Sequence, residues 1–84
     1  MTTPFNEAEI AAARAVTPGA DRVIHLNHAG SSLPPQVVLD TQIEHLRAEA
    51  TIGGYEAAAA ASERIEGVYD SVGRLIGASP VEVA

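Results

Sequence analysis

The sequence predicts a mostly helical chain with three helices and one short strand. Apolar residues recur every three or four positions in two long stretches, and Pro or Gly residues separate these stretches. A capping signature also appears twice, in which Asn or Ser precedes a segment and Glu follows three residues later. These patterns locate the ends of helices more clearly than they define a hydrophobic core.

The first helix is expected over Glu7 to Val16. Asn6 can cap it while Glu9 reaches back to the cap residue, which would form a capping box. Pro18 then ends it, because Pro disfavours helical backbone in the residue before it and Gly follows as a turn residue. The apolar face of this helix is weak, so we expect it to lean on a larger body.

A short strand is expected over Val23 to Leu26, because half of this segment is β-branched. The polar loop from Asn27 to Pro34 should end the strand. Pro35 suits the first turn of a second helix, where its missing N–H is not needed. That helix is expected over Gln36 to Ala50. Its apolar stripe, at spacings of four, three and four, consists of Leu39, Ile43, Leu46 and Ala50.

Gly53 and Gly54 break the second helix, and the chain restarts at Tyr55. The third helix is the most regular element, with Tyr69 in the middle of its apolar stripe and therefore expected in the core. Gly77 should cap this helix, and Ser79 to Glu82 should form one further helical turn. The stripe consists of Ile65, Val68, Tyr69, Val72, Leu75 and Ile76.

Composition limits what this chain can do. Its 84 residues include 16 alanines, and the only aromatic residues are Phe5, Tyr55 and Tyr69, so a core built from them would be small. The chain has no cysteine and a formal charge of -6 without any lysine, which argues against disulfides, nucleic-acid binding and anionic membranes. No signal peptide or membrane span is recognisable, so a cytoplasmic location is expected.

Three histidines raise the question of a metal site. His25 and His28 stand three residues apart at the end of the expected strand, and His45 falls on the second helix. The first two should point to different faces, and no carboxylate or thiolate completes a ligand set. No metal site is therefore expected.

The loop after the expected strand permits two interpretations. Asn27, His28, Ala29, Gly30 and Ser31 could close a strand as an ordinary polar turn, with Asn and Gly supplying the turn geometry. They could instead form one edge of an active site. The residues by themselves leave both interpretations open. The join at Gly53, Gly54 and Tyr55 is similarly either a helix break with a packed aromatic residue or a segment near a site.

Two stretches carry a resemblance to a known family. HLNHAGSSLPPQVVLD resembles the N-terminal strand, Asn-x-Ala/Gly, Pro and helix signature of class V aminotransferase-like enzymes, the pyridoxal-phosphate (PLP) group of cysteine desulfurases, selenocysteine lyases and isopenicillin N epimerase. SVGRLIGASPVEVA resembles the helix, Gly cap and Ser-Pro-x-Glu turn that precede the phosphate loop of that family. Together with LRAEATIGGYEAA, the pattern is most similar to actinobacterial C–S lyases of ergothioneine biosynthesis.

The resemblance implies an α/β fold of PLP fold type I, of which residues 1–84 are the N-terminal segment. This segment would supply part of the small domain and dimer arm and one edge of the substrate site, while the PLP-binding large domain is absent from the chain. No cofactor-binding residue is expected here, because the Schiff-base lysine and its partners lie further along in that family and this chain has no lysine. Expected partners are the rest of the polypeptide, a second subunit and a small sulfur amino acid.

The resemblance also implies roles for particular residues. The substrate-side residues would be Asn27, His28, Ala29, Gly30, Ser31 and Tyr55. Tyr55 could in addition act as an acid toward a sulfur leaving group. The parent enzyme would cleave a C–S bond in a cysteine-derived substrate such as hercynylcysteine sulfoxide. Two alternatives stay open: a cysteine desulfurase or epimerase of the same family, and a helical interaction module without catalysis that pairs through the stripe from Ile65 to Ile76.

Overall fold

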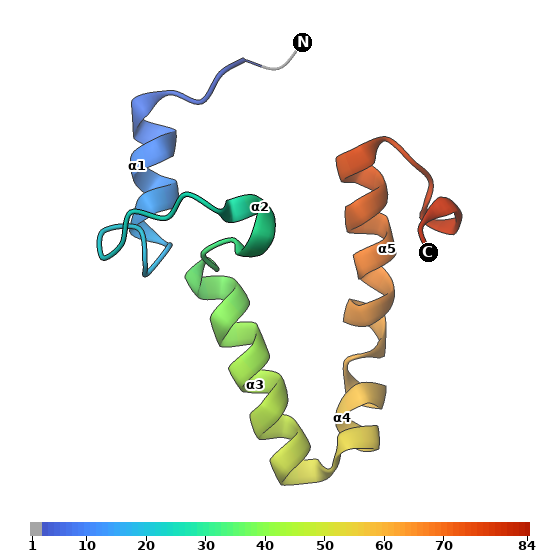
Figure 1. Ribbon diagram of the computed structural model, residues 1–84. Coiled ribbons are helices and arrows are strands. Elements are labelled where there is room, and N and C mark those ends of the chain that lie inside the picture. The colour runs from blue at the N-terminus through green and yellow to red at the C-terminus, as the bar shows by residue number, and fades with distance from the viewer. Residues whose placement is uncertain (1–2) are drawn as a thin grey trace. The chain divides into compact units, whose positions relative to one another are not determined.

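A computed structural model describes residues 3–84, and every regular element in that range is helical (Figure 1). The elements are α1 (Glu7–Ala15), α2 (His28–Ser31), α3 (Gln36–Ile52), α4 (Gly54–Ala60), α5 (Ser62–Ile76) and the 3₁₀ helix η1 (Pro80–Glu82). The chain divides into two compact units, Met1–Glu44 and His45–Ala84. The boundary falls within α3.

Helix α1 confirms the predicted start. Asn6 Oδ1 accepts from the Glu9 N–H at 2.9 Å, and the Asn6 N–H donates to Glu9 Oε2 at 2.9 Å, which completes the capping box. The helix ends at Ala15, with Val16 as its C-cap, one residue earlier than expected. Local hydrogen bonding thus suffices to begin this helix without any buried side chain.

The predicted strand over Val23 to Leu26 is wrong. The segment is irregular backbone, and none of the described residues 3–84 lies in a strand. β-Branched residues favour extended backbone, but a strand exists only where a second strand pairs with its N–H and C=O groups. Ile24 and Leu26 are each 91% exposed, so the segment has no apolar support either.

Polar contacts link α1 to the residues that follow it. Arg14 Nη2 lies 2.8 Å from Asp21 Oδ1 and donates to the Ala20 carbonyl at 3.0 Å. The N–H of Gln36 donates to the Val16 carbonyl at 2.7 Å, which ties the start of α3 to the end of α1. The first unit is therefore organised by hydrogen bonds, with no buried residue in α1 or α2.

Helix α3 begins at Gln36 as predicted and continues to Ile52, two residues beyond the expected end. The Pro35 carbonyl accepts from the Leu39 N–H at 3.3 Å, so Pro35 stands at the helix entrance, where its missing N–H is not needed. Gly53 follows with φ of 98°, a backbone conformation that side chains with a Cβ rarely adopt. The predicted break at Gly53 is confirmed.

The predicted third helix is split in two at Ala61, which is a second correction to the expected three helices. The C-cap of α4 and the N-cap of α5 are the same residue, Ala61, whose φ and ψ are −93° and 4°. The N–H of Ile65 still donates to the Ala61 carbonyl at 2.9 Å, so α5 follows after a single non-helical residue. Helix α4 covers four of the five consecutive alanines from Ala57 to Ala61.

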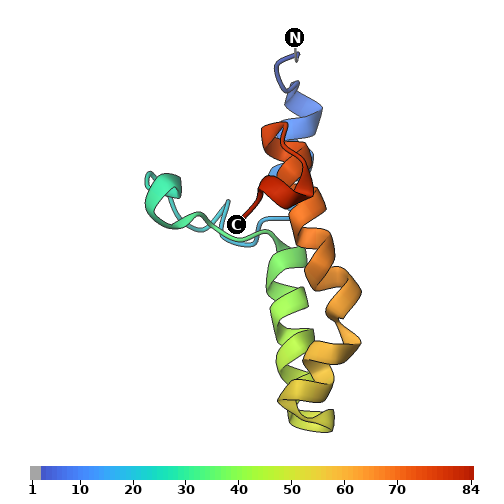
Figure 2. The ribbon, with the colours of Figure 1, turned by 90° about the vertical axis from the view of Figure 1, so that its right-hand side faces the viewer.

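The C-terminal turn folds back beside α5 (Figure 2). Gly77 has φ of 73°, and the N–H of Ala78 donates to the Gly73 carbonyl at 2.8 Å, the bond that defines a Schellman cap. Gly73 is buried where the returning chain passes close to α5. A Cβ at this position would lie 2.6 Å from the Ala78 carbonyl oxygen. The predicted Gly77 cap and the predicted turn at Ser79 to Glu82 are both confirmed.

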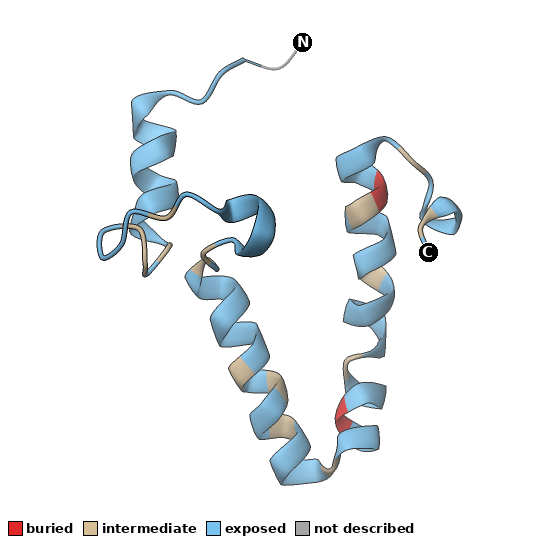
Figure 3. Ribbon diagram, in the orientation of Figure 1, coloured by how far each residue is buried: buried red, intermediate tan, exposed pale blue. Residues whose placement is uncertain are grey.

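Burial is sparse in the part of the chain that the structure describes (Figure 3). Ala57 is the buried apolar residue there, and no large side chain is fully buried. Tyr69 is 38% exposed and Leu75 is 84% exposed, so the expectation that the α5 stripe forms a core is wrong within this chain. Helix periodicity predicts which face is apolar, but it does not supply a surface to cover that face.

None of the helices in residues 3–84 combines the length and the apolar character that crossing a bilayer requires.

Candidate functional site

The predicted site residues from Asn27 to Ser31 form one compact turn. Asn27 caps the single-turn helix α2, and its Oδ1 accepts from the Gly30 N–H at 3.0 Å. The Ser31 N–H donates to the Asn27 carbonyl at 3.0 Å. A Cβ on residue 30 would lie 2.5 Å from Asn27 Nδ2, so glycine at this position leaves room for the capping side chain. Asn27, His28, Ala29, Gly30 and Ser31 are thus brought together, all of them exposed.

Two histidines hold the ends of this turn. His25 Nε2 lies 2.7 Å from the Ser31 carbonyl oxygen, and His28 Nδ1 lies 3.1 Å from Ser32 Oγ. The two rings meet edge to face with their centroids 4.5 Å apart. His25 was not among the residues predicted for the site. Its only signal in the sequence is its position before the turn, because the contact with Ser31 depends on the path of the backbone between them.

An open hollow of about 410 Å³ lies beside the turn in the first unit. His25 and His28 line it together with Arg14 of α1, and its remaining surface is largely apolar. The lining residues are Ala13, Arg14, Thr17, Ala20, Val23, Ile24, His25, His28 and Leu33. Nitrogen-bearing and apolar side chains thus share the lining of this open hollow. The predicted residues Asn27, Ala29, Gly30 and Ser31 do not line this hollow.

Tyr55 is the predicted site residue outside the turn from Asn27 to Ser31. It lies near the start of α4 in the second unit, and its side chain is 92% exposed. Its phenol has no hydrogen bond within residues 3–84, and its substrate contact and its role as an acid stay predictions.

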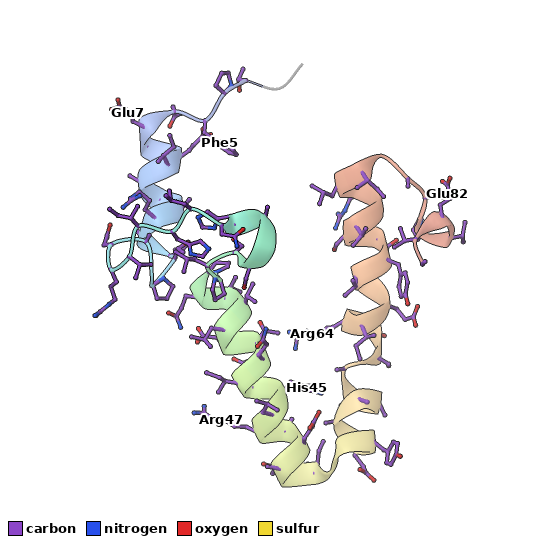
Figure 4. The ribbon with its side chains drawn as sticks, in the orientation of Figure 1. Phe5, Glu7, His45, Arg47, Arg64 and Glu82 are labelled. Atoms are coloured by element: carbon purple, nitrogen blue, oxygen red, sulfur yellow. The ribbon has the colours of Figure 1, made fainter. Side chains whose placement is uncertain are left out.

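No group of three or more His, Asp or Glu side chains in residues 3–84 is arranged to hold an ion. His45 of α3 instead lies 3.0 Å from Glu49, one helical turn further on (Figure 4). This is an i,i+4 pair on a partly exposed helix face and contributes a few tenths of a kcal/mol at most.

A second open hollow lies on the polar face of α5, in the second unit. Arg64, Asp70 and Arg74 line it together with Ala78 and Pro80, so the C-terminal turn forms one of its walls. The apolar stripe of α5 lies on the other side of the helix by its periodicity. The returning turn therefore leaves the stripe open.

Glu82 lies in the C-terminal turn, where its carboxylate accepts two hydrogen bonds (Figure 4). The Ser79 N–H and the Ser79 hydroxyl both donate to its Oε1, each at 2.9 Å. These two hydrogen bonds, the backbone one first, lower the pKa of Glu82. The contact therefore stabilises the C-terminal turn more strongly when Glu82 is ionised than when it is protonated.

Acid should therefore open the C-terminal turn. Because the pKa of Glu82 is depressed in the folded state, its contribution to stability is complete above the unfolded value of about 4.3 and is lost as the pH falls through the folded value. NMR titration should show the Ser79 amide shift following the Glu82 carboxyl. Glu82→Gln, which keeps an acceptor oxygen, should remove this pH dependence. A Ser79 amide that titrates unchanged in Glu82→Gln would contradict this assignment.

Comparison with known proteins finds no match to this chain among family models, curated proteins or solved structures.

Proposed function

We propose that this chain is the N-terminal segment of a PLP-dependent lyase of the class V aminotransferase-like group, which cleaves a C–S bond in a cysteine-derived substrate. The observation that supports this most directly is the turn at Asn27. It is an exposed, self-capped loop that presents an amide, an imidazole and small residues to its surroundings. The sequence resemblance assigns this loop to the substrate side of a fold-type I active site.

The residues of this chain do not hold PLP themselves. That cofactor supplies an electron sink for chemistry at an amino acid, and it is held through a lysine amine and a partner for its ring nitrogen. The 84 residues contain no lysine. The proposal therefore places the cofactor and proton transfer on other residues of a homodimeric cytoplasmic enzyme, and it gives this chain the binding and orientation of the substrate.

The Asn27 side chain has free hydrogen-bond donors with which it could bind and orient a substrate. Its Oδ1 is engaged by the Gly30 N–H, whereas its Nδ2 makes no hydrogen bond within residues 3–84. An amide N–H₂ fixed by a cap at its other end is a preorganised donor for a substrate carboxylate or sulfoxide oxygen. His28 and the backbone of Ala29 to Ser31 would shape the same edge. The substrate contact that the resemblance implies for Tyr55 belongs to the same proposal.

Asn27→Ala should weaken substrate binding in the full-length enzyme by roughly 10- to 100-fold, because a hydrogen bond to a charged group is removed. PLP affinity should stay unchanged, since this chain does not hold the cofactor. The measurements are KM for the sulfur amino acid and the absorption spectrum of bound PLP.

Asn6→Ala is the matched control for this experiment. Asn6 is also an asparagine N-cap with the same Oδ1 contact to the third residue, so its loss costs a similar amount, about 1 kcal/mol, in helix stability. KM should hardly change in that variant. Equal loss of substrate and PLP affinity in Asn27→Ala would count against the site. A full-length protein that forms no lysine adduct with PLP would overturn the function.

The exposed stripe of α5 favours a second candidate, a helical interaction module without catalysis. Its members include Ile65, Val68, Leu75 and Ile76, whose exposed fractions range from 48% to 84%. An apolar face of this kind can pair with another helix. A desulfurase or epimerase activity remains the alternative within the PLP group, and product analysis with a cysteine-derived substrate separates it from C–S lyase activity.

A further inference from the structure

The two imidazoles at the turn have opposite hydrogen-bonding roles. A carbonyl oxygen only accepts, so His25 must donate from Nε2 to the Ser31 carbonyl at 2.7 Å. A backbone N–H only donates, so His28 must accept at Nδ1 from the Leu33 N–H at 3.4 Å. His28 therefore carries its single proton on Nε2 when the turn is closed.

Protonation affects these two contacts differently. An imidazolium has N–H groups at both nitrogens, so His25 keeps its donor when it is charged. His28 loses its acceptor, and its new Nδ1–H faces the Leu33 N–H. Ser32 Oγ lies 3.1 Å from the same Nδ1 and donates to the Leu33 carbonyl at 3.4 Å, so it can accept from charged His28. Protonation thus removes the Leu33 contact of His28 and leaves Ser32 Oγ, which already lies 3.1 Å from Nδ1, as its partner.

Within residues 3–84, no carboxylate forms an ion pair with His28. His25 stacks edge to face against it, and Arg14 lines the same hollow. Arg14 is held by Asp21 at 2.8 Å. A positive charge on His28 would therefore arise near His25 and Arg14. Of these two, Arg14 is already paired with the Asp21 carboxylate.

We propose that the Asn27 turn carries a proton-operated latch at its exit: it is closed while His28 is neutral, and the Leu33 N–H is released when His28 is protonated. Leu33 packs over Gly19, where a Cβ would lie 3.1 Å from Leu33 Cδ2. It also leads through Pro34 and Pro35 into α3. Opening the latch would loosen the join between the turn and that helix. This device does not depend on PLP chemistry or on the proposed substrate.

The latch can be tested by NMR on the intact protein over a pH series in which the protonation of the His28 ring is read from its own ring signals. The Leu33 amide shift should follow the protonation of the His28 ring. Its protection against hydrogen exchange, corrected for the intrinsic rate, should fall about two- to tenfold from high to low pH, the range expected for one net hydrogen bond. His28→Ala should remove the pH dependence and leave Leu33 at the low protection level throughout.

Two controls distinguish the latch from a general effect of acid. His45→Ala removes an imidazole that pairs with Glu49 on α3, so it should leave the Leu33 titration unchanged. Ser32→Ala removes the alternative partner, and the Leu33 amide should still respond to His28. A Leu33 amide that is flat with pH, or one that titrates equally in His28→Ala, would overturn the proposal.

Discussion

Gly73→Ala is expected to detach the C-terminal turn from α5. The new Cβ would lie 2.6 Å from the Ala78 carbonyl oxygen and 3.6 Å from the Pro80 nitrogen, and both belong to backbone that cannot move aside as a flexible side chain can. Overpacking of this kind costs about 1–3 kcal/mol, which exceeds what one short exposed turn can supply. The Ala78 N–H should lose its bond to the residue 73 carbonyl, and residues 78–84 should lose their fixed position.

Gly67→Ala is the matched control. Gly67 lies in the same helix, and a Cβ there meets nothing within 4 Å. The substitution should stabilise α5 by about 0.5–1 kcal/mol, because alanine has less backbone freedom to lose in a helix. The two variants can be compared by limited proteolysis after residue 77 and by the Ser79 and Glu82 amide signals. Gly73→Ala with an intact Glu82 signal would contradict the packing described for this turn.

The chain on its own is expected to unfold without a cooperative transition. Among the described residues, Ala57 is the only buried apolar residue, whereas Phe5, Leu26, Leu75 and Val81 are at least 80% exposed. Burial contributes about 25 cal/mol per Å² of apolar surface, and ordering costs about 1.5 kcal/mol per residue, so a chain with almost no core has no favourable balance. Circular dichroism should show helix content that declines gradually with heat.

The same measurement separates the two candidate functions. A segment of a larger enzyme should gain a cooperative melt only together with the surfaces that cover its apolar residues. A sharp melt and a discrete oligomer from the 84-residue chain would support the interaction module instead, because the α5 stripe would then be buried between copies. Replacement of Leu75, the most exposed member of the stripe, by Ser should abolish such an oligomer and leave a gradual melt unchanged.

Helix ends were the features most accessible to sequence reasoning, because capping is local. The boxes at Asn6 and Ser79 involve residues three apart, and Gly77 needs only the left-handed backbone that glycine adopts readily. The turn at Asn27 was predicted as a polar loop, but its single helical turn was not. In the sequence there, Gly30 follows Asn27 by three positions. Asn27 is the cap residue, and Gly30 leaves the space that the capping side chain requires.

Other predictions depended on partners distant in sequence. Val23 to Leu26 has strand composition, yet no strand forms because nothing in residues 3–84 pairs with it. Tyr69 lies on an apolar stripe, yet it is exposed because periodicity specifies a face and not its cover. The contact between His25 and the Ser31 carbonyl likewise could not be predicted from the sequence, because it depends on the path of the backbone between the two residues.

The sequence by itself determined where α1 and α3 begin, where α5 ends and which face of each long helix is apolar, because these properties follow from hydrogen bonds and spacings within a few residues. Only the tertiary structure decided which faces are covered, that the expected strand stays irregular, and that Gly73 admits the returning chain at Ala78. Burial and pairing are relations between segments, so their outcome depends on which surfaces meet in space.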